Sequence, residues 1–478
     1  RDAYQKALAV IPDYGMALNN LACVYADHLN QLEKAYPLAR RARDVSPSDP
    51  SVADTLGWIL YRRGEYTPAL VLLRESAAKL YSIPVIQFHL GMACYMDGLE
   101  SEAKTAFQRA LSLNGSFLEK DDCQRHLAII NIDPDRAGAD TRAWLEKWTK
   151  NYPNDPVALA RLAAIYQSKG MTDKALGTDQ AILNANPQNV FALENMAELY
   201  ASADPQKACA FAKSAYEASP GNPGIVHLYG RLAFKTGDYS WSLTLLQLAA
   251  QSRPHDPNVL FDLGQALYSE GKVSAAQTFA QKALQSDSNF TRADDARRFL
   301  AMTDLADNVV RASATQVDQI LSASPGYVPA LMVKAAICAE KSDTSIALQT
   351  YRQILNIYPD FAPAKKELAL LYADNPVDDT EGYRVAVQAR QAFPNDPYVA
   401  KSLAMIVCRQ GDYARAAGLL QESAHRLNND PQLLYYLGLA QFHLNNVPAS
   451  KANLQRALAL DLSGQDAVDA RRMLAELK

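Results

Sequence analysis

The amino-acid sequence predicts an all-α fold, a solenoid of tandem helix-turn-helix units, and three observations lead to this class. A Leu-Gly pair recurs as Leu56-Gly57, Leu90-Gly91 and Leu263-Gly264, and the step from Gly57 to Gly91 is a period of about 34 residues. Apolar residues within each unit follow a helical spacing. The composition, with 49% hydrophobic and 21% charged residues, suits helices that bury one face. A period of this size is typical of small units that bury their apolar faces only by stacking on one another.

The unit that begins near residue 156 shows how each element is predicted. The apolar residues of its first helix recur at i, i+3, i+4 and i+7 and share one helix face: Leu159, Leu162, Ala163 and Tyr166. Gly170 then supplies the positive φ that a tight turn between helices requires. The second helix covers residues 175–182 and ends before Pro187, because proline lacks the backbone N–H of a helix interior. The stretch Asn154-Asp155-Pro156 provides the N-cap of the unit.

Tiling the chain with this template predicts its organisation. The predicted segments are the second helix of a truncated unit (1–14), three units (15–117), a degenerate unit or spacer (118–155), four units (156–290), a second spacer (291–327), four units (328–462) and a C-terminal helix (463–478). Both spacers lack the Leu-Gly pair and are expected to have longer first helices. Because the chain opens within a second helix and without Met, we expect it to be a fragment or a processed product.

A longer period of about 173–174 residues groups the units in fives. Gly64, Gly237 and Gly411 stand one such period apart, and each is followed by an acidic residue and a tyrosine. The helix that opens each spacer recurs as DCQRHLA, DARRFLA and DARRMLA, at residues 122–128, 295–301 and 469–475. We call each such group of five units a block; the first block ends with the spacer 118–155 and the second with 291–327. The chain therefore holds almost three blocks.

Composition and motifs exclude several functions. The net charge is −4, with 48 basic residues interleaved with 52 acidic ones, so we expect no nucleic-acid partner. No run of 18 apolar residues predicts a membrane span. The catalytic and phosphate-binding motifs P-loop, GxGxxG, HExxH and GxSxG are all missing, so we predict no enzyme, no catalytic residue and no cofactor.

The cysteines and histidines carry no metal-ligand spacing. The six cysteines include no CxxC pair, and we expect them to be small buried residues; a disulfide between Cys94 and Cys123 is the alternative. The seven histidines are scattered along the chain. We therefore predict no metal site.

The repeating unit resembles the tetratricopeptide repeat over essentially the whole chain. The stretch Asp54-Thr55-Leu56-Gly57-Trp58, followed by Tyr61, Gly64, Tyr66 and Ala69, shows the pattern most fully. The resemblance implies a right-handed superhelix of helical pairs, in which the first helices line a concave groove. Positions 2, 5, 6, 9, 12 and 13 of each unit would then face the groove.

Aromatic and basic residues are dense at these groove positions and recur from block to block. The candidate ligand-binding residues are Trp58, Tyr61, Arg62, Phe88, His89, Tyr95, Arg231, Phe234, Lys235, Phe261, Asp262, Tyr268, Arg409, Tyr435, Phe442 and His443. Two interpretations stay open. The rings either pack against the first helix of the next unit, or form a stripe that faces a ligand while the basic residue fixes an anionic group.

We predict a non-catalytic scaffold that binds an extended peptide or a partner helix in the groove. A second hypothesis comes from Asn19-Asn20-Leu21-Ala22, Tyr25-Ala26-Asp27 and residues 54–58, which resemble bacterial tetratricopeptide lipoproteins of exopolysaccharide and exosortase systems. That resemblance implies an export component of the periplasm or outer membrane, with polysaccharide as ligand. A third is a regulatory array of an enzyme whose catalytic domain is missing from this fragment. The expected compartment is the bacterial cytoplasm or periplasm, and a signal or lipid anchor is compatible with the sequence.

Overall fold

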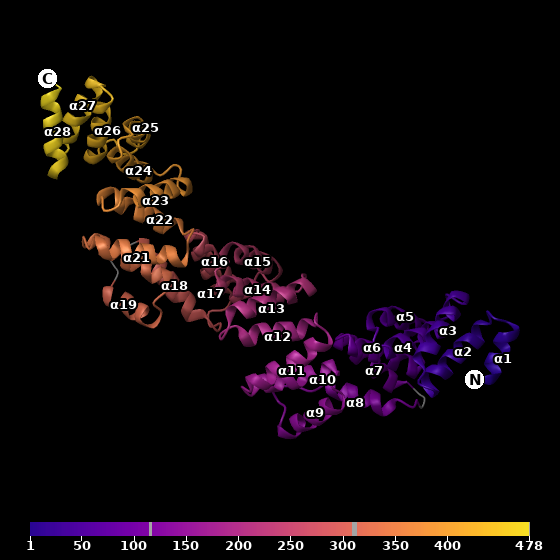
Figure 1. Cartoon of the computed structure of the whole chain (residues 1–478). Helices are drawn as coiled ribbons and strands as arrows, with labels where there is room; N and C mark the ends of the chain where they lie inside the picture. Colours follow the sequence, from indigo (N-terminus) through magenta and orange to yellow (C-terminus); the bar gives the residue numbers. More distant parts are fainter. Residues whose placement is uncertain (114–116, 308–312, 478) are drawn as a thin grey trace. The chain divides into compact units, whose positions relative to one another are not determined.

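The computed structural model describes residues 1–113, 117–307 and 313–477, and its regular secondary structure there is helical (Figure 1). Residues 114–116, 308–312 and 478, which the predicted segments include, lie outside the described residues. The helices form two compact units, which we call the N-terminal unit (Arg1–Ser219) and the C-terminal unit (Pro220–Lys478). The predicted all-α fold of helix-turn-helix repeats is confirmed, and the division into repeats and spacers stays a proposal.

The N-terminal unit alternates the first and second helices of successive repeats. Its helices are α1 (Asp2–Val10), α2 (Gly15–Cys23) with the π-helix η1 (Val24–His28), α3 (Leu32–Val45), α4 (Pro50–Arg62), α5 (Tyr66–Lys79), α6 (Pro84–Met96), α7 (Glu100–Ser112), α8 (Lys120–Ile130), α9 (Ala139–Asn151), α10 (Pro156–Ser168), α11 (Thr172–Ala185), α12 (Val190–Tyr200) and α13 (Pro205–Ala218).

The C-terminal unit continues the alternation. Its helices are α14 (Pro223–Thr236), α15 (Tyr239–Ser252), α16 (Pro257–Ser269), α17 (Val273–Ser286), α18 (Ala293–Asp307), α19 (Ala314–Ala323), α20 (Val328–Glu340), α21 (Thr344–Ile357), α22 (Ala362–Asp374), α23 (Asp379–Ala392), α24 (Pro397–Arg409), α25 (Tyr413–Ala424), α26 (Pro431–His443), α27 (Val447–Ala459) and α28 (Gly464–Glu476).

The predicted helix ends have a clear local chemistry. Asp49, Asp256 and Asp396 each accept a hydrogen bond from a backbone N–H of the first helical turn, directly before a proline. Gly170 has φ of 68°, which confirms the predicted turn, and Gly64 has φ of 81°. The spacers differ from expectation, since α8 has 11 residues and is not lengthened, whereas α18 has 15.

The Leu-Gly pair permits close packing of the two helices in a repeat. A Cβ added at Gly91 in α6 would lie 2.5 Å from the Phe107 ring of α7, so a side chain there would displace the ring. Ala103, on the facing helix, is fully buried. A hydrophobic core runs through consecutive repeats, from Ala22 to Ala175 in the N-terminal unit and from Leu243 to Met473 in the C-terminal unit. A smaller cluster of Leu18, Ala42 and Val52 lies beside the first.

The prediction that the cysteines are buried holds for three of the six, whereas Cys23, Cys209 and Cys338 are half-buried. No disulfide joins any of the six, all of which lie in the described residues. Cys94, Cys123 and Cys408 are buried, and burial raises the pKa of the Cys94 thiol to about 12. The alternative of a disulfide between Cys94 and Cys123 was therefore wrong.

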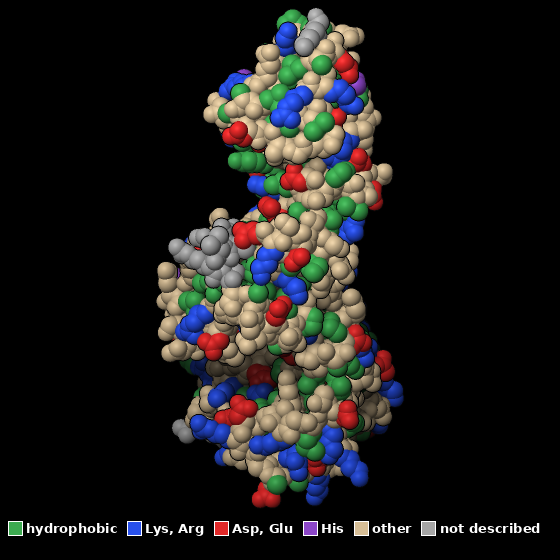
Figure 2. Space-filling view, turned by 90° about the vertical axis from the view of Figure 1, so that its left-hand side faces the viewer, with side chains coloured by type: hydrophobic (Ala, Val, Ile, Leu, Met, Phe, Trp, Pro, Cys, Tyr) green, Lys and Arg blue, Asp and Glu red, His purple; other side chains and the backbone are tan. Residues whose placement is uncertain are grey.

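Charge on the molecule is locally balanced. On the face that Figure 2 shows, Lys and Arg side chains are interspersed with Asp and Glu. Ion pairs join neighbouring repeats, as in Arg43–Glu75 and Arg390–Glu422, which hold the same place in the first and third blocks and are both 2.5 Å long. No helix within the described residues combines the length and hydropathy needed to span a bilayer.

Candidate functional site

Five of the predicted ligand-binding aromatic residues lie in the core. They are between 0% and 5% exposed: Phe88, Tyr95, Phe261, Tyr268 and Tyr435. The Tyr95 ring meets the His126 ring edge-on at 4.8 Å between centroids, and the Tyr268 ring meets Phe299 in the same way at 5.2 Å. For these positions the structure favours the first interpretation, core packing against the next repeat, although Phe88 and Phe261 each also line a cavity.

The recurring basic position joins adjacent repeats. The Nη1 of Arg62 donates to the carbonyl oxygen of Ala26 at 2.6 Å, and the Nη1 of Arg409 donates to that of Ala373 at 2.7 Å. Each guanidinium also pairs with an aspartate of the preceding repeat. Arg62 and Arg409 therefore satisfy the carbonyl end of the preceding first helix, and their charge is already compensated. A role in fixing an anionic ligand, as the sequence suggested, is not supported for either.

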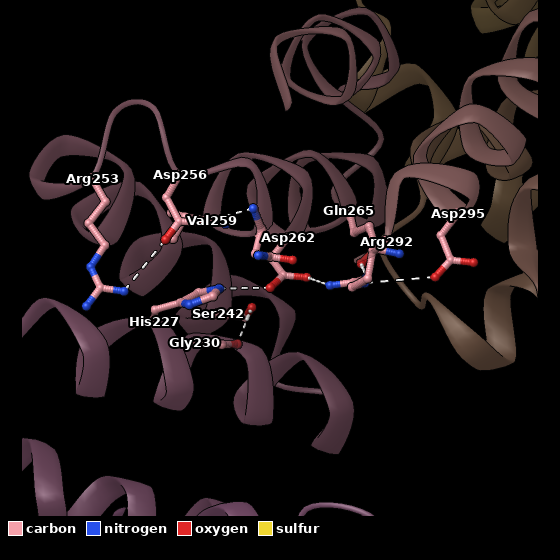
Figure 3. Close-up of polar contacts among 11 residues, drawn as sticks. His227, Gly230, Ser242, Arg253, Asp256, Val259, Asp262, Gln265, Arg292 and Asp295 are labelled. Carbon is pink, nitrogen blue, oxygen red and sulfur yellow. Dashed lines mark hydrogen bonds and ion pairs between the residues drawn. The ribbon is translucent and has the colours of Figure 1, made fainter. Parts of the chain in front are cut away.

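His89 and Asp262 each belong to a histidine–aspartate pair. The two pairs occupy equivalent positions in the first and second blocks, with histidine and aspartate exchanged. His89 Nδ1 lies 3.0 Å from an oxygen of Asp54, and His227 Nε2 lies 2.8 Å from Asp262 Oδ2. Each residue has its counterpart one block period away, with acid and histidine exchanged. Asp262 also pairs with Arg292 (Figure 3). Burial alone would raise the pKa of Asp262, but the hydrogen bond from His227 and the charge of Arg292 hold that pKa below its usual range.

The other predicted residues are accessible to different degrees. Trp58, Tyr61, Phe234 and Phe442 are half-buried, whereas Arg231, Lys235 and His443 are exposed. Phe234 packs edge-on against Tyr239 at 5.2 Å, and His443 stacks on Tyr413 at 4.0 Å.

Trp58 and Tyr61 open onto an aromatic pocket of about 520 Å³ within the N-terminal unit. Their rings form one wall and are stacked at 4.6 Å with an angle of 7° between planes. A second wall comes from the spacer 118–155: His126 on α8, Trp148 on α9 and Tyr152 just after it. The floor is apolar and consists of Phe88, Met92 and Met96. We use the name aromatic pocket for this cavity.

Asp155 holds the Trp148 side of the aromatic pocket in place. Trp148 Nε1 and the Tyr95 hydroxyl both donate to its carboxylate at 2.8 Å, and its Oδ1 also accepts the backbone N–H of Ala158. One carboxylate therefore fixes a ring of the wall, anchors a core tyrosine and caps α10. This arrangement is preorganised for binding.

The rim of the aromatic pocket is acidic. Glu119 and Asp122 line it, and Asp122 pairs with the exposed Arg125. The Glu119 carboxylate has no ion-pair partner among the residues that the structure describes. Burial raises the pKa of the Tyr61 hydroxyl, so that ring stays neutral.

A second cavity of about 820 Å³ adjoins the aromatic pocket, and the two share Met96 and Asn154. Tyr66 lines the second cavity, and its ring lies 5.7 Å from that of Tyr61. The far side is lined by three asparagines of α11 and the turn after it: Asn184, Asn186 and Asn189. The two cavities are neighbours, one lined by aromatic rings and the other rich in amides, and we refer to them together as the groove.

Sequence reasoning missed half of this site. His126, Trp148 and Tyr152 fall in the spacer, which was interpreted as structural. A signal existed, because Trp144, Trp148 and Tyr152 recur at every fourth position and so share one helix face. Within the part of the chain that the structure describes, no cluster of His, Cys, Asp or Glu could hold a metal ion.

Comparisons with known proteins agree with the helical repeats. Two family models described as tetratricopeptide repeat match residues 229–289 and 402–450, and residues 330–360. A tetratricopeptide repeat-containing protein of Pseudomonas aeruginosa is 38% identical over 80 residues. Those residues are 17% of this chain and 13% of that relative, so the chain spans a small part of the relative's length.

Two solved structures are similar to this chain at low identity and low TM-score. The tetratricopeptide domain of P58(IPK) is 15% identical with a TM-score of 0.32, over 90% of this chain and 98% of that one. The hetero-tetramer Cut9-Hcn1 of the APC/C is 15% identical with a TM-score of 0.30, over 91% and 92%. Likeness at this level carries no information about what the present chain binds.

Proposed function

We propose that this chain, a tetratricopeptide repeat protein, is a non-catalytic scaffold that holds a segment of a partner protein in the groove of the N-terminal unit. The observation that carries the proposal is the aromatic pocket, whose rings come from two repeats and a spacer. Half-buried aromatic side chains in a preformed cavity are typical anchor points of protein interfaces.

The shape of the groove favours a polypeptide ligand. The aromatic pocket is wide enough for one large side chain, and the adjoining cavity extends it past Met96 and Asn154. The amides of Asn184, Asn186 and Asn189 are of the type that both donates to and accepts from a peptide backbone. An anchor side chain and a polar track for the backbone are the two parts that an extended segment requires.

The exposed candidate residues of the later blocks are proposed as secondary contacts. In the C-terminal unit these are Arg231 and Lys235, which lie on α14, and His443 at the end of α26.

A polysaccharide ligand is the second candidate. The flat rings of Trp58 and Tyr61 suit the apolar faces of sugars as well as those of side chains. This candidate rests on the rings alone and serves as an outcome of the experiment.

The proposal is tested by selecting peptides from a random displayed library on the full chain, with binding to a glycan array in parallel. Tyr152→Ala removes a pocket ring that is 54% exposed, and Tyr398→Ala removes a ring that is 51% exposed in the C-terminal unit as a matched control. We expect the selected peptides to lose binding to Tyr152→Ala and to keep it with Tyr398→Ala. Peptides that bind both variants equally would show that the groove is not the site, and glycans lost with Tyr152→Ala would favour the second candidate.

A further inference from the structure

We infer that the aromatic pocket receives an arginine side chain of the partner segment, an inference that rests on the proposed function. It comes from comparing the aromatic pocket with its counterpart in the second block, where the chain supplies an arginine of its own.

The counterpart is found by position in the block. Phe261 lies one block period after Phe88. The first spacer is one residue longer than the second, so the offset after it is one residue shorter than the block period. With this offset Ile320 corresponds to Trp148, and Ser324 corresponds to Tyr152. These three residues of the second block line a cavity of about 190 Å³, against about 520 Å³ for the aromatic pocket. Replacement of Trp148 and Tyr152 by smaller residues thus coincides with a smaller cavity.

Arg292 lies beside this smaller cavity and contacts its lining. Its guanidinium carbon lies 4.7 Å from the centroid of the Phe261 ring, and its Nη2 donates to Gln265 Oε1 at 2.7 Å. Both contacted residues line the cavity. Its Nη1 forms the ion pair with Asp262 that Figure 3 shows. A cation against the ring face, an acceptor beside it and a buried carboxylate make up a complete guanidinium site.

The residue at the position of Arg292 in the first block is Glu119. The aromatic pocket therefore keeps the floor ring Phe88 but has a carboxylate where the second block has a guanidinium. Lysine and arginine are missing from the described lining of the aromatic pocket, while Glu119 and Asp122 are present. The Trp58 and Phe88 rings are 6.1 Å apart between centroids, and both line the pocket of about 520 Å³. Aromatic walls with an acidic rim are complementary to a cation.

The geometry favours arginine over a compact cation such as an ammonium group. The Trp58 ring is stacked between Tyr61 and His89, so a guanidinium would meet the aromatic residues of the lining mainly at their edges and at the exposed Tyr152 ring. A guanidinium is planar and its edge donates to carboxylates, which fits this lining with Glu119 beside it. An acidic segment would instead meet Glu119 and Asp122 as like charges. The partner is thus expected to present an arginine within an extended segment.

The test uses two small probes, N-acetyl-arginine amide and N-acetyl-citrulline amide, which have nearly the same shape and differ in charge. Fluorotryptophan in the full chain reports binding, because Trp58 and Trp148 line the aromatic pocket whereas Trp241 lies in the C-terminal unit. We expect the arginine probe to shift the signals of Trp58 and Trp148, with a smaller shift of Trp144, which stacks on Trp148, and to leave that of Trp241 unchanged. We expect citrulline to bind about tenfold more weakly.

Glu119→Arg transfers the arginine of the second block to the first and is expected to abolish binding of the arginine probe. Asp121→Arg is the matched control, because Asp121 is exposed in the first turn of α8, which Glu119 precedes, and does not line the aromatic pocket. It is expected to change affinity by less than about threefold. Circular dichroism checks folding, and Glu119→Gln gives a second, milder variant that should weaken binding.

Equal binding of arginine and citrulline, or arginine binding that survives Glu119→Arg, would overturn the inference. The peptides selected for the proposed function separate the two failures. Peptides that depend on Tyr152 but lack arginine would refute the inference and leave the proposed function standing. The absence of any peptide that depends on Tyr152 would refute both.

Discussion

Asp179 makes the stability of the N-terminal unit depend on pH in an unusual direction. The residue lies on α11 with no exposed surface, and its Oδ2 has no hydrogen-bond partner among the described residues. Its Oδ1 accepts a bond from Asn195 at 3.4 Å, and burial raises its pKa to about 7. The corresponding residue of the next block is the buried Tyr351. A carboxyl group thus lies where the next block has an uncharged ring.

The sign and size of the effect follow from linkage between protonation and folding. In the unfolded chain this carboxyl group loses its proton near pH 4, and in the folded chain only near pH 7. Between these values unfolding releases a proton, so stability falls as pH rises and then levels off above pH 7. The loss is on the order of 2–3 kcal/mol between pH 5 and pH 8.

Asp179→Asn should remove this pH dependence. We expect the variant to be more stable than the wild type by about 2–4 kcal/mol at pH 8 and by about 1 kcal/mol near pH 5. The difference in local stability is measured by hydrogen exchange of the α11 and α12 amides. The ratio of the exchange rate in the variant to that in the wild type is taken at each pH, because the intrinsic exchange rate cancels in this ratio. Asp173→Asn, an exposed substitution on the same helix, is the control. A ratio that is the same at pH 5 and pH 8 would refute the buried, protonated carboxyl group.

Three further predictions concern contacts between helices. Asp54→His and His89→Asp should each lower the free energy of unfolding by about 1–3 kcal/mol. The double variant should recover most of that loss, since the second block carries the reversed pair. Urea denaturation in a double-mutant cycle measures the recovery, and a double variant without recovery would contradict the equivalence of the blocks. Gly91→Ala should lower thermal stability by about 1–3 kcal/mol, because its Cβ would lie 2.5 Å from the Phe107 ring; an unchanged melting temperature would count against it. Arg409→Lys should lower the free energy of unfolding by about 1–2 kcal/mol, since an ammonium group cannot reach two carbonyl oxygens and a carboxylate at once. Faster amide hydrogen exchange at the end of α22 would show this loss. Unchanged exchange would argue against a stabilising role of the Arg409 contacts.

The fold was predictable because its signals are steric. Gly91 is required by the close approach of the Phe107 ring, and Gly170 by a φ of 68°, so both residues report geometry directly. The spacers lack such markers, and the expected lengthening of α8 was wrong. The π-helix η1 left no recognisable pattern in the sequence.

The site was predicted only in part, because a helical spacing identifies residues on one face but not what lies opposite. Arg62 and Arg409 do share a position, yet each is opposite a backbone carbonyl of its own chain. Trp58 and Tyr61 do open onto a pocket, but its other wall belongs to a spacer without the repeat pattern. Trp148 and Tyr152 could not be assigned to that wall until the spacer was folded against α4 and α6.

Differences between blocks are more informative about function here than recurrences. Duplication copies core and surface alike, and the recurrent features proved to be core rings, such as Tyr95 and Tyr268, or links between repeats. Glu119 and Arg292 occupy one position with opposite charge, and this exchange accompanies the larger cavity of the first block. The charge at this position is reversed between the blocks, while the phenylalanine ring beside it is kept. We infer that the residue at this position contacts a different group in each block. In the second block that contact is made within the chain, and in the first it is left for a partner.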